Sequence, residues 1–341
     1  MSQTIVGWDV GGAHLKAARL DGAGRLISAR IAPCALWRGL DQLDAAFDAL
    51  DEPSARSAVT MTGELVDLFP DRASGVSALV ERLVERLGPE TAFYAGSAGF
   101  LNAGQAKSEW RSVASANWRA TAEALATESD GLLLDVGSTT TDLVPFAGGR
   151  LDNRGATDAD RMAAHELVYL GVARTPVMAI APQAPFRGAW IAPMAEHFAT
   201  SADVFRLTGD LPEGADLHPT ADGADTSLPS SARRLLRMVG ADLGPDGDRE
   251  ARALARWLAE AVLRRLADAA ALVLSREGAP RIPTVYGAGV GRFLAAGVAR
   301  RLGLMYRDVG GLWADDPALA STAADCAPAV AVARLIARRP A

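Results

Sequence analysis

The chain of 341 residues is poor in cysteine and histidine, with two and four copies respectively. Two cysteines, Cys34 and Cys326, cannot build the disulfide framework of a small secreted domain, so we exclude that class and expect a reducing compartment. His165, His197 and His218 show no metal-ligand spacing, which argues against a zinc module.

The sequence also lacks an excess of positive charge and long apolar runs. Thirty-five basic residues face 41 acidic ones, for a net charge of −6, so nothing indicates a nucleic-acid partner. No run reaches the roughly 18 apolar residues of a membrane span, and the N-terminus shows no signal-peptide pattern. We therefore expect a cytoplasmic protein that acts on small molecules, without a membrane partner. The composition is compatible with a homo-oligomer.

Two stretches of the chain share one sequence pattern. Residues 5–16 and 132–142 each begin with an apolar strand, continue into Asp-Val-Gly, and go on with small or hydroxyl residues. Each opens a strand-turn-strand-turn-strand order, with expected strands over 4–10, 15–20, 25–31, 131–135, 141–146 and 150–152. The repeat predicts two domains, 1–130 and 131–341. At 341 residues the chain is long enough for both.

The remaining pattern predicts an α/β protein. We expect helices over 39–51, 76–87, 117–126, 158–170, 231–239, 249–275, 292–302 and 325–338, with helical segments in 190–206, and further strands over 57–62, 91–95 and 282–286. Residues 182–230 form an insertion whose stretch from 211 is rich in Gly, Pro, Asp and Ser and is typical of a long loop or lid. The closing helix can pack back on the first domain.

The first repeated loop carries groups that suit phosphate. Gly11, Gly12 and Ala13 offer backbone amides that can converge on an anion, and Lys16 adds a point charge. Asp9 would repel phosphate but suits a hydrated Mg²⁺. The plainer alternative is a hairpin whose aspartate stabilises a turn.

The second repeated loop replaces lysine with hydroxyls. Its binding groups would be Gly137, Ser138, Thr139 and Thr140. Asp135 occupies the place of Asp9 and again suits a metal ion. Asp142, in the outgoing strand, can pair with Lys16, act as a base or stabilise a turn.

A third glycine-rich turn lies between a strand and a helix near the C-terminus. It contains Gly287, Gly289 and Gly291. A single turn of this kind is weak evidence for a nucleotide, because close strand-to-helix packing also demands glycine. It fits best as a third loop of the same predicted cleft.

These three turns, in this order, resemble the phosphate-1, phosphate-2 and adenosine motifs of the superfamily of actin, sugar kinases and chaperone ATPases. The matching ranges are 5–19, 131–146 and 284–295. The resemblance implies a duplicated actin-like, ribonuclease H-like fold: two domains with mixed sheets flanked by helices around a central cleft.

More closely, the chain is similar to hydantoinase/oxoprolinase-like proteins of tetrahydromethanopterin-linked one-carbon transfer. The stretches that carry this similarity are 7–16, 61–65, 115–121, 135–142 and 157–176. That family's activity implies a transferase of methanofuran biosynthesis. An aminomethylfuran diphosphate condenses with the phenol of γ-glutamyltyramine, an ether forms, and diphosphate leaves.

The resemblance assigns expected roles. Asp9 and Asp135 would hold Mg²⁺, and Lys16 and the two loops would bind diphosphate. Asp142 or His14 would take the phenolic proton. Predicted acceptor contacts, at the edge of the predicted cleft, are Asn153, Arg154 and Asp158.

Two other functions stay open at the level of the sequence. One is an ATP-dependent small-molecule kinase, which would contact adenine through residues 287–291. The other is a nucleotide-binding regulatory module without turnover. ATP is therefore compatible with the loops but not required by the transferase interpretation.

Overall fold

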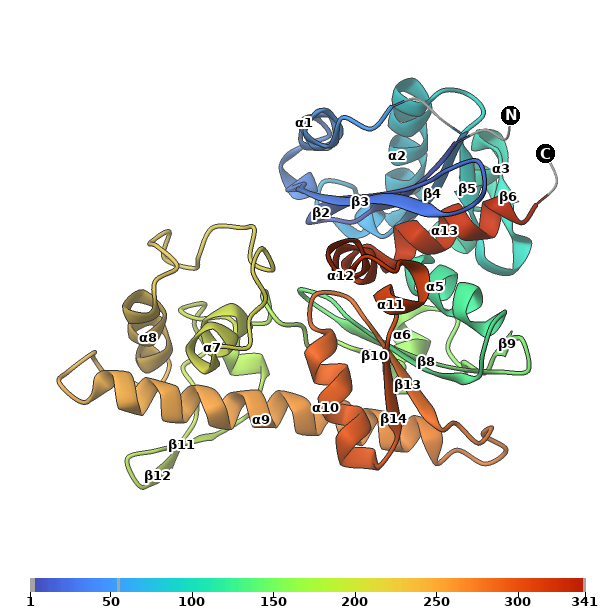
Figure 1. Cartoon of the computed structure of the whole chain (residues 1–341). Coiled ribbons are helices and arrows are strands. Elements are labelled where there is room, and N and C mark those ends of the chain that lie inside the picture. Colours follow the sequence, from blue (N-terminus) through green and yellow to red (C-terminus); the bar gives the residue numbers. More distant parts are fainter. Residues whose placement is uncertain (1–3, 54–55, 340–341) are drawn as a thin grey trace. The chain divides into compact units, whose positions relative to one another are not determined.

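The computed structural model describes residues 4–53 and 56–339, and they divide into two compact units. Unit 1 comprises residues 1–131, 146–152 and 308–341, and unit 2 comprises 132–145 and 153–307. Figure 1 shows the chain coloured along its length. The C-terminal segment thus belongs to the unit that contains the N-terminus.

Unit 1 contains a six-stranded mixed sheet in the order β3-β2-β1-β4-β5-β6. Its strands are β1 (Ile5–Val10), β2 (His14–Leu20), β3 (Leu26–Pro33), β4 (Arg56–Met61), β5 (Ala92–Tyr94) and β6 (Phe100–Leu101). The first three strands are antiparallel, whereas β4 runs parallel to β1 and β5 parallel to β4. The carboxyl ends of β1, β4 and β5 therefore meet at one edge of the sheet.

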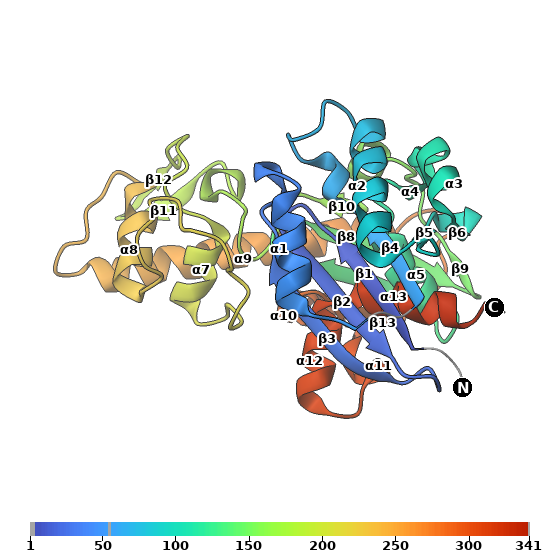
Figure 2. The same ribbon diagram turned by 90° about the horizontal axis from the view of Figure 1, so that it is seen from above.

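Helices cover both faces of this sheet. They are α1 (Asp41–Leu50), α2 (Arg72–Leu87), α3 (Ala103–Ser108), α4 (Trp110–Val113), α5 (Asn117–Ala126), α11 (Gly310–Trp313), α12 (Pro317–Asp325) and α13 (Ala327–Ala337). Val6, Trp8 and Val10 point from β1 into the core that α1 and α2 complete. The opposite face of β1 carries α13, and Figure 2 shows the same sheet from above.

One glycine allows α13 to lie directly on β1. A Cβ atom on Gly7 would lie 2.0 Å from the carbonyl oxygen of Ala329, so any side chain there would push the helix away. The helix is rich in alanine and nearly all of its residues are buried. Small residues on both sides thus dock a helix from the end of the chain on its first strand.

Unit 2 contains most of the second sheet, whose order is β10-β8-β7-β13-β14 with β9 paired to β8; only β9 and the terminal residues of β7, β8 and β14 fall within the ranges of unit 1. The strands of this sheet are β7 (Gly131–Val136), β8 (Thr141–Ala147), β9 (Arg150–Leu151), β10 (Leu167–Val168), β13 (Thr284–Ala288) and β14 (Met305–Asp308), and a separate hairpin pairs β11 (Ala184–Phe186) with β12 (Ala189–Ile191). The helices of unit 2 are α6 (Asp158–Ala163), α7 (Ser201–Thr208), α8 (Leu228–Arg237), α9 (Gly247–Leu274) and α10 (Arg292–Leu302).

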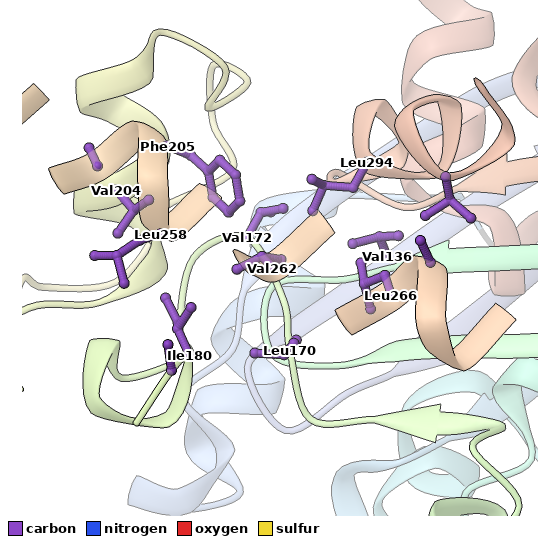
Figure 3. Close-up of a cluster of buried hydrophobic side chains, with 14 of the residues drawn as sticks. Val136, Leu170, Val172, Ile180, Val204, Phe205, Leu258, Val262, Leu266 and Leu294 are labelled. Atoms are coloured by element: carbon purple, nitrogen blue, oxygen red, sulfur yellow. The ribbon is translucent and has the colours of Figure 1, made fainter. Parts of the chain in front are cut away.

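The long helix α9 organises the core of unit 2. Leu254, Leu258, Val262 and Leu266 recur every four residues and are buried. Figure 3 shows the last three of them among side chains from β7, α7 and α10. This core supports the turn between β7 and β8, because it includes Val136 at the end of β7.

Several expected elements differ from the structure. The helix expected over 158–170 ends at Ala163, because His165 adopts a left-handed conformation (φ 57°) and β10 follows. Of the segment 190–206, only α7 from Ser201 is helical. The segment from 211 is irregular until α8, and β14 was not expected.

Among the described residues, no single helix has the length and apolar character to cross a membrane. Helices α12 and α13 reach both only as a pair, and they meet at an angle of 94°.

Candidate functional site

The first repeated loop is a tight turn between β1 and β2. The Gly11 amide donates to the carbonyl of His14 (3.0 Å). The carbonyls of Gly12 and Ala13 accept from the amides of Leu36 (3.1 Å) and Cys34 (2.8 Å). The segment after β3 therefore occupies two carbonyl oxygens that would otherwise repel an anion.

The second repeated loop closes in the same way. The Gly137 amide donates to the carbonyl of Thr140 (2.8 Å), again three residues ahead. The carbonyl of Gly137 accepts from Val172 (3.1 Å), and that of Ser138 accepts from Arg174 (2.7 Å). Carbonyl oxygens are again engaged by a neighbouring segment, while the half-buried hydroxyls of the turn keep partial access to solvent.

Close packing fixes the second turn further. A Cβ on Gly171 would lie 2.4 Å from the carbonyl carbon of Ser138 and from the Thr139 amide nitrogen. Such contacts with backbone atoms cannot be relieved by a rotamer change. Gly171 lies in the stretch 157–176 of the sequence resemblance, so that stretch serves to hold the second turn.

In unit 1, Asp9 and Lys16 lie directly opposite each other on β1 and β2. Lys16 Nζ is 3.8 Å from Asp9 Oδ2, and the lysine side chain is 21% exposed against 5% for the aspartate. The pair explains how a buried carboxylate is tolerated beside a turn of phosphate-binding type. His14 begins β2 and is half-buried.

In unit 2, the third glycine-rich turn packs on the end of β7. A Cβ on Gly289 (φ 78°) would lie 2.4 Å from the Val136 carbonyl oxygen and 2.6 Å from Asp135 Oδ1, while Gly291 and Gly287 face Val136 and Tyr306 at similar distances. Close packing therefore accounts for all three glycines. A nucleotide contact at this turn stays a prediction.

Asp142 is held by a buried arginine. Arg161 Nη2, on a side chain that is 2% exposed, donates to Asp142 Oδ1 (2.7 Å) and also to the Glu166 carbonyl (3.1 Å). Burial raises the pKa of Asp142, and the guanidinium of Arg161 opposes this rise. Arg161 is thus the ion-pair partner of this carboxylate.

The predicted acceptor residues make local contacts in unit 2. Asn153 Nδ2 donates to the Gly155 carbonyl (2.7 Å), and Arg154 Nη2 to the Glu277 carbonyl (3.4 Å). Asp158 lies in the first turn of α6, near enough to raise the pKa of Asp142. The role of all three in substrate binding stays a prediction.

A fully buried carboxylate secures this segment. Glu166 accepts from the amides of Arg154 (2.6 Å) and Gly155 (2.9 Å) and from Arg276 Nη1 (2.6 Å). The role of Glu166 is not visible in the sequence, because its partners come from positions up to 110 residues away.

A buried hydrogen-bonded pair that is not apparent from the sequence lies in unit 1. Ser115 Oγ donates to Glu64 Oε1 (2.9 Å), and Glu64 is 2% exposed. Both residues belong to stretches quoted for the family resemblance, but nothing in the sequence brings them together. Burial raises the pKa of Glu64.

No group of three or more His, Cys, Asp or Glu side chains that could hold a metal ion occurs in the part of the chain that the structure describes. Sites that complete their shell with phosphate and water need only one or two carboxylates.

Among solved structures, a nucleotide-free acetone carboxylase, described as ATP-dependent, matches with a TM-score of 0.57. The alignment covers 96% of this chain and 70% of that one, with 10% sequence identity. Together with the repeated strand-turn-strand order, this match confirms the predicted actin-like α/β fold with mixed sheets flanked by helices.

Curated relatives include the (4-{4-[2-(γ-L-glutamylamino)ethyl]phenoxymethyl}furan-2-yl)methanamine synthase of Methanocaldococcus jannaschii. It is 30% identical over 71% of this chain and 73% of its own length. The synthase of the same name from Methanococcus vannielii is 30% identical over 33% of this chain and 50% of its own. The chain is thus an enzyme, in keeping with the predicted transferase.

The match to a family model covers most of the chain, from residue 56 to residue 338. It includes the second turn, the third turn and the Glu64–Ser115 pair. The chain belongs to the hydantoinase/oxoprolinase family.

Proposed function

We propose that this enzyme joins an aminomethylfuran diphosphate to the phenol of γ-glutamyltyramine. The phenol loses its proton, its oxygen bonds to the furylmethyl carbon, and the bond from that carbon to diphosphate breaks. The products are the methanofuran-core ether and diphosphate.

The observation that carries this proposal is the 30% identity to a synthase over 71% of the chain. The name of that relative describes an ether between a phenol and a furylmethyl group. The two phosphate-type turns support the same reaction, because a diphosphate leaving group needs donors that stabilise its developing charge.

We assign phosphate-binding roles to Lys16 and the first turn, with Gly11, Gly12 and Ala13, and to the second turn, with Gly137, Ser138, Thr139 and Thr140; the amides of Gly11 and Gly137 close their own turns. Lys16 supplies a cation, whereas the second turn supplies neutral hydroxyl and amide donors. A furylmethyl carbon supports positive charge, so departure of diphosphate can lead the reaction. Stabilising that departure is then the main task of these residues.

The donor chemistry also fits Mg²⁺. Asp9 and Asp135 each end an apolar strand just before a turn, and each offers carboxylate oxygens. Mg²⁺ on a phosphate substrate takes one or two carboxylates and completes its octahedron with phosphate oxygens and water. Bound there, it would neutralise charge on the leaving diphosphate.

For the acceptor, we assign Arg154 to the glutamyl carboxylate, with Asn153 and Asp158 beside it. The guanidinium of Arg154 is exposed, so it can exchange its contact with the Glu277 carbonyl for a carboxylate.

Purified enzyme with Mg²⁺, the furan diphosphate and γ-glutamyltyramine, without ATP, tests the proposal. We expect a product with the mass of the ether and one equivalent of released diphosphate. The absence of product, together with ATP hydrolysis that a small molecule stimulates, would instead establish the kinase alternative. Binding of ATP without turnover, also without ether, would indicate a regulatory module.

A further inference from the structure

Two stretches of the chain are not used by the function proposed above. One is residues 61–65, and the other is residues 115–121. The structure joins them through one hydrogen bond, from Ser115 Oγ to Glu64 Oε1 (2.9 Å), across 51 residues of sequence. This contact within unit 1 joins two stretches that carry the family resemblance.

The segment that carries Glu64 lies beside the first phosphate-type turn. Glu64 belongs to a short 3₁₀ turn, Gly63–Leu65, that follows β4, the parallel neighbour of β1. A Cβ on Gly63 would lie 3.2 Å from the Val10 carbonyl oxygen, and one on Gly12 would lie 2.8 Å from Val66 Cγ1. The segment that carries Glu64 is therefore packed against the turn to which we assign the diphosphate.

The pair is also costly to maintain. Glu64 is 2% exposed, and its Oε2 has no hydrogen-bond partner within the described residues. Ser115 is held at φ 52°, a left-handed conformation that non-glycine residues rarely adopt. A buried carboxylate with one oxygen unsatisfied and a strained serine both cost stability, and such features concentrate at functional sites.

We propose that Ser115 and Glu64 form a proton relay that removes the phenolic proton during ether formation; this rests on the proposed function. Ser115 Oγ accepts the proton of the phenol and passes its own proton to Glu64 Oε1. The phenol oxygen then bonds to the furylmethyl carbon as diphosphate leaves. Glu64 ends protonated and returns the proton to solvent before the next cycle.

The geometry suits this relay. Ser115 is half-buried and can meet a substrate, whereas Glu64 is too enclosed to do so directly. The serine already donates to the carboxylate, so its lone pairs are left to accept from a phenol. Burial raises the pKa of Glu64, which strengthens it as a base, and Arg72 on α2 is the charged group that opposes this.

The two bases predicted from the sequence, Asp142 and His14, suit other roles than removal of the phenolic proton. Asp142 Oδ1 already accepts a hydrogen bond from the buried Arg161 (2.7 Å), so this oxygen is engaged within unit 2. His14 begins β2 directly after the first turn, where its side chain would serve as a diphosphate contact.

The test compares Glu64→Gln and Ser115→Gly with the wild type in the ATP-free assay. Gln keeps the shape of Glu64, and Gly accepts the left-handed conformation while it removes the hydroxyl. We expect each variant to lower kcat by about 100-fold, and the double variant to lose little more, because both act in one step. Glu123→Gln is the control, since both oxygens of Glu123 are engaged by Tyr94 and Arg119; it should leave kcat unchanged.

A second measurement separates a relay from a structural role. With acceptors whose phenol carries fluorine, and is therefore more acidic, the deficit of Glu64→Gln should shrink by about tenfold or more, because an ionised phenol needs no base. The variant should also unfold at the same or a higher temperature than the wild type, because it removes a buried carboxylate.

The relay is wrong if wild-type enzyme forms the ether and Glu64→Gln keeps its kcat. It is equally wrong if the deficit is the same for every phenol, or if only His14→Gln shows the dependence on phenol acidity. If the wild-type enzyme forms no ether at all, the proposed function itself is wrong. The same assay distinguishes this outcome from a loss of kcat in the variants alone.

Discussion

The two repeated turns share their closure but differ in charge. Each closes with an amide that donates to the carbonyl three residues ahead, from Gly11 in unit 1 and from Gly137 in unit 2. Two residues beyond each turn, the same position of the repeat holds Lys16 in the first strand pair and Asp142 in the second. The same backbone arrangement thus carries side chains of opposite charge in the two units.

The partners of these two residues explain the difference. Lys16 lies 3.8 Å from the buried Asp9 and keeps partial access to solvent. Asp142 is neutralised by Arg161, which is nearly fully buried. We propose a division between the turns in which the first supplies the cation for an anionic ligand and the second supplies neutral donors. Substitutions in the two turns test this division.

The largest effect is expected at Lys16. Lys16→Met should lower the rate of diphosphate release by about 100- to 1,000-fold, whereas Ser138→Ala should lower it by about tenfold, because one charge stabilises a leaving anion more than one hydroxyl does. Steady-state kinetics with the furan diphosphate measure both. Lys107→Met, which removes a surface ion pair with Glu81, is the control. Equal losses from the two turns would contradict the division.

The next effect concerns the frame of the second turn. Gly171→Ala should lower the free energy of unfolding by about 3 kcal/mol, because the new methyl group meets the backbone of Ser138 and Thr139. Thermal and denaturant unfolding measure the loss. Gly244→Ala is matched, since a Cβ there meets nothing within 4 Å, and it should be neutral. A stable Gly171→Ala protein would show that this turn is not rigid.

A smaller effect is expected at Asp142. Asp142→Asn leaves Arg161 without its counter-charge and should cost about 2 kcal/mol, less than for a fully buried pair because the aspartate side chain is 15% exposed. Denaturant unfolding reports the cost. The folded variant should still form the ether. Abolished ether formation without loss of stability would restore Asp142 as the base.

The smallest effect concerns the two thiols of unit 1. Burial raises the pKa of both Cys34 and Cys326 to about 12, so neither is ionised at pH 8 in the folded protein. A thiol reagent at pH 8 should react with neither until the protein is unfolded. Because these pKa values exceed those of the unfolded chain, the thiols should lower the free energy of unfolding as pH rises from about 9 to 12. Rapid labelling of Cys34, whose amide holds the first turn, would show that this turn opens.

The sequence predicted the elements around both turns well. Apolar runs followed by Asp-Val-Gly placed β1 and β7 correctly, and helical spacing placed α9 within two residues at each end. These are local signals, which a pattern of neighbouring residues can carry. The helix expected over 158–170 was wrong because the chain turns at His165 (φ 57°), and the hydrogen bond from Arg276 to the next residue, Glu166, spans 110 residues of sequence.

The sequence by itself determined the repeat, the fold class and the kinds of groups at each turn, because glycine, carboxylate, lysine and hydroxyl residues follow their strands at fixed spacing. Only the tertiary structure decided their partners: Arg161 for Asp142, the segment from Gly171 for the second turn, and Ser115 for Glu64. The physical reason is that ion pairs and buried hydrogen bonds join residues far apart in the chain, and their partners are fixed only when the chain is packed.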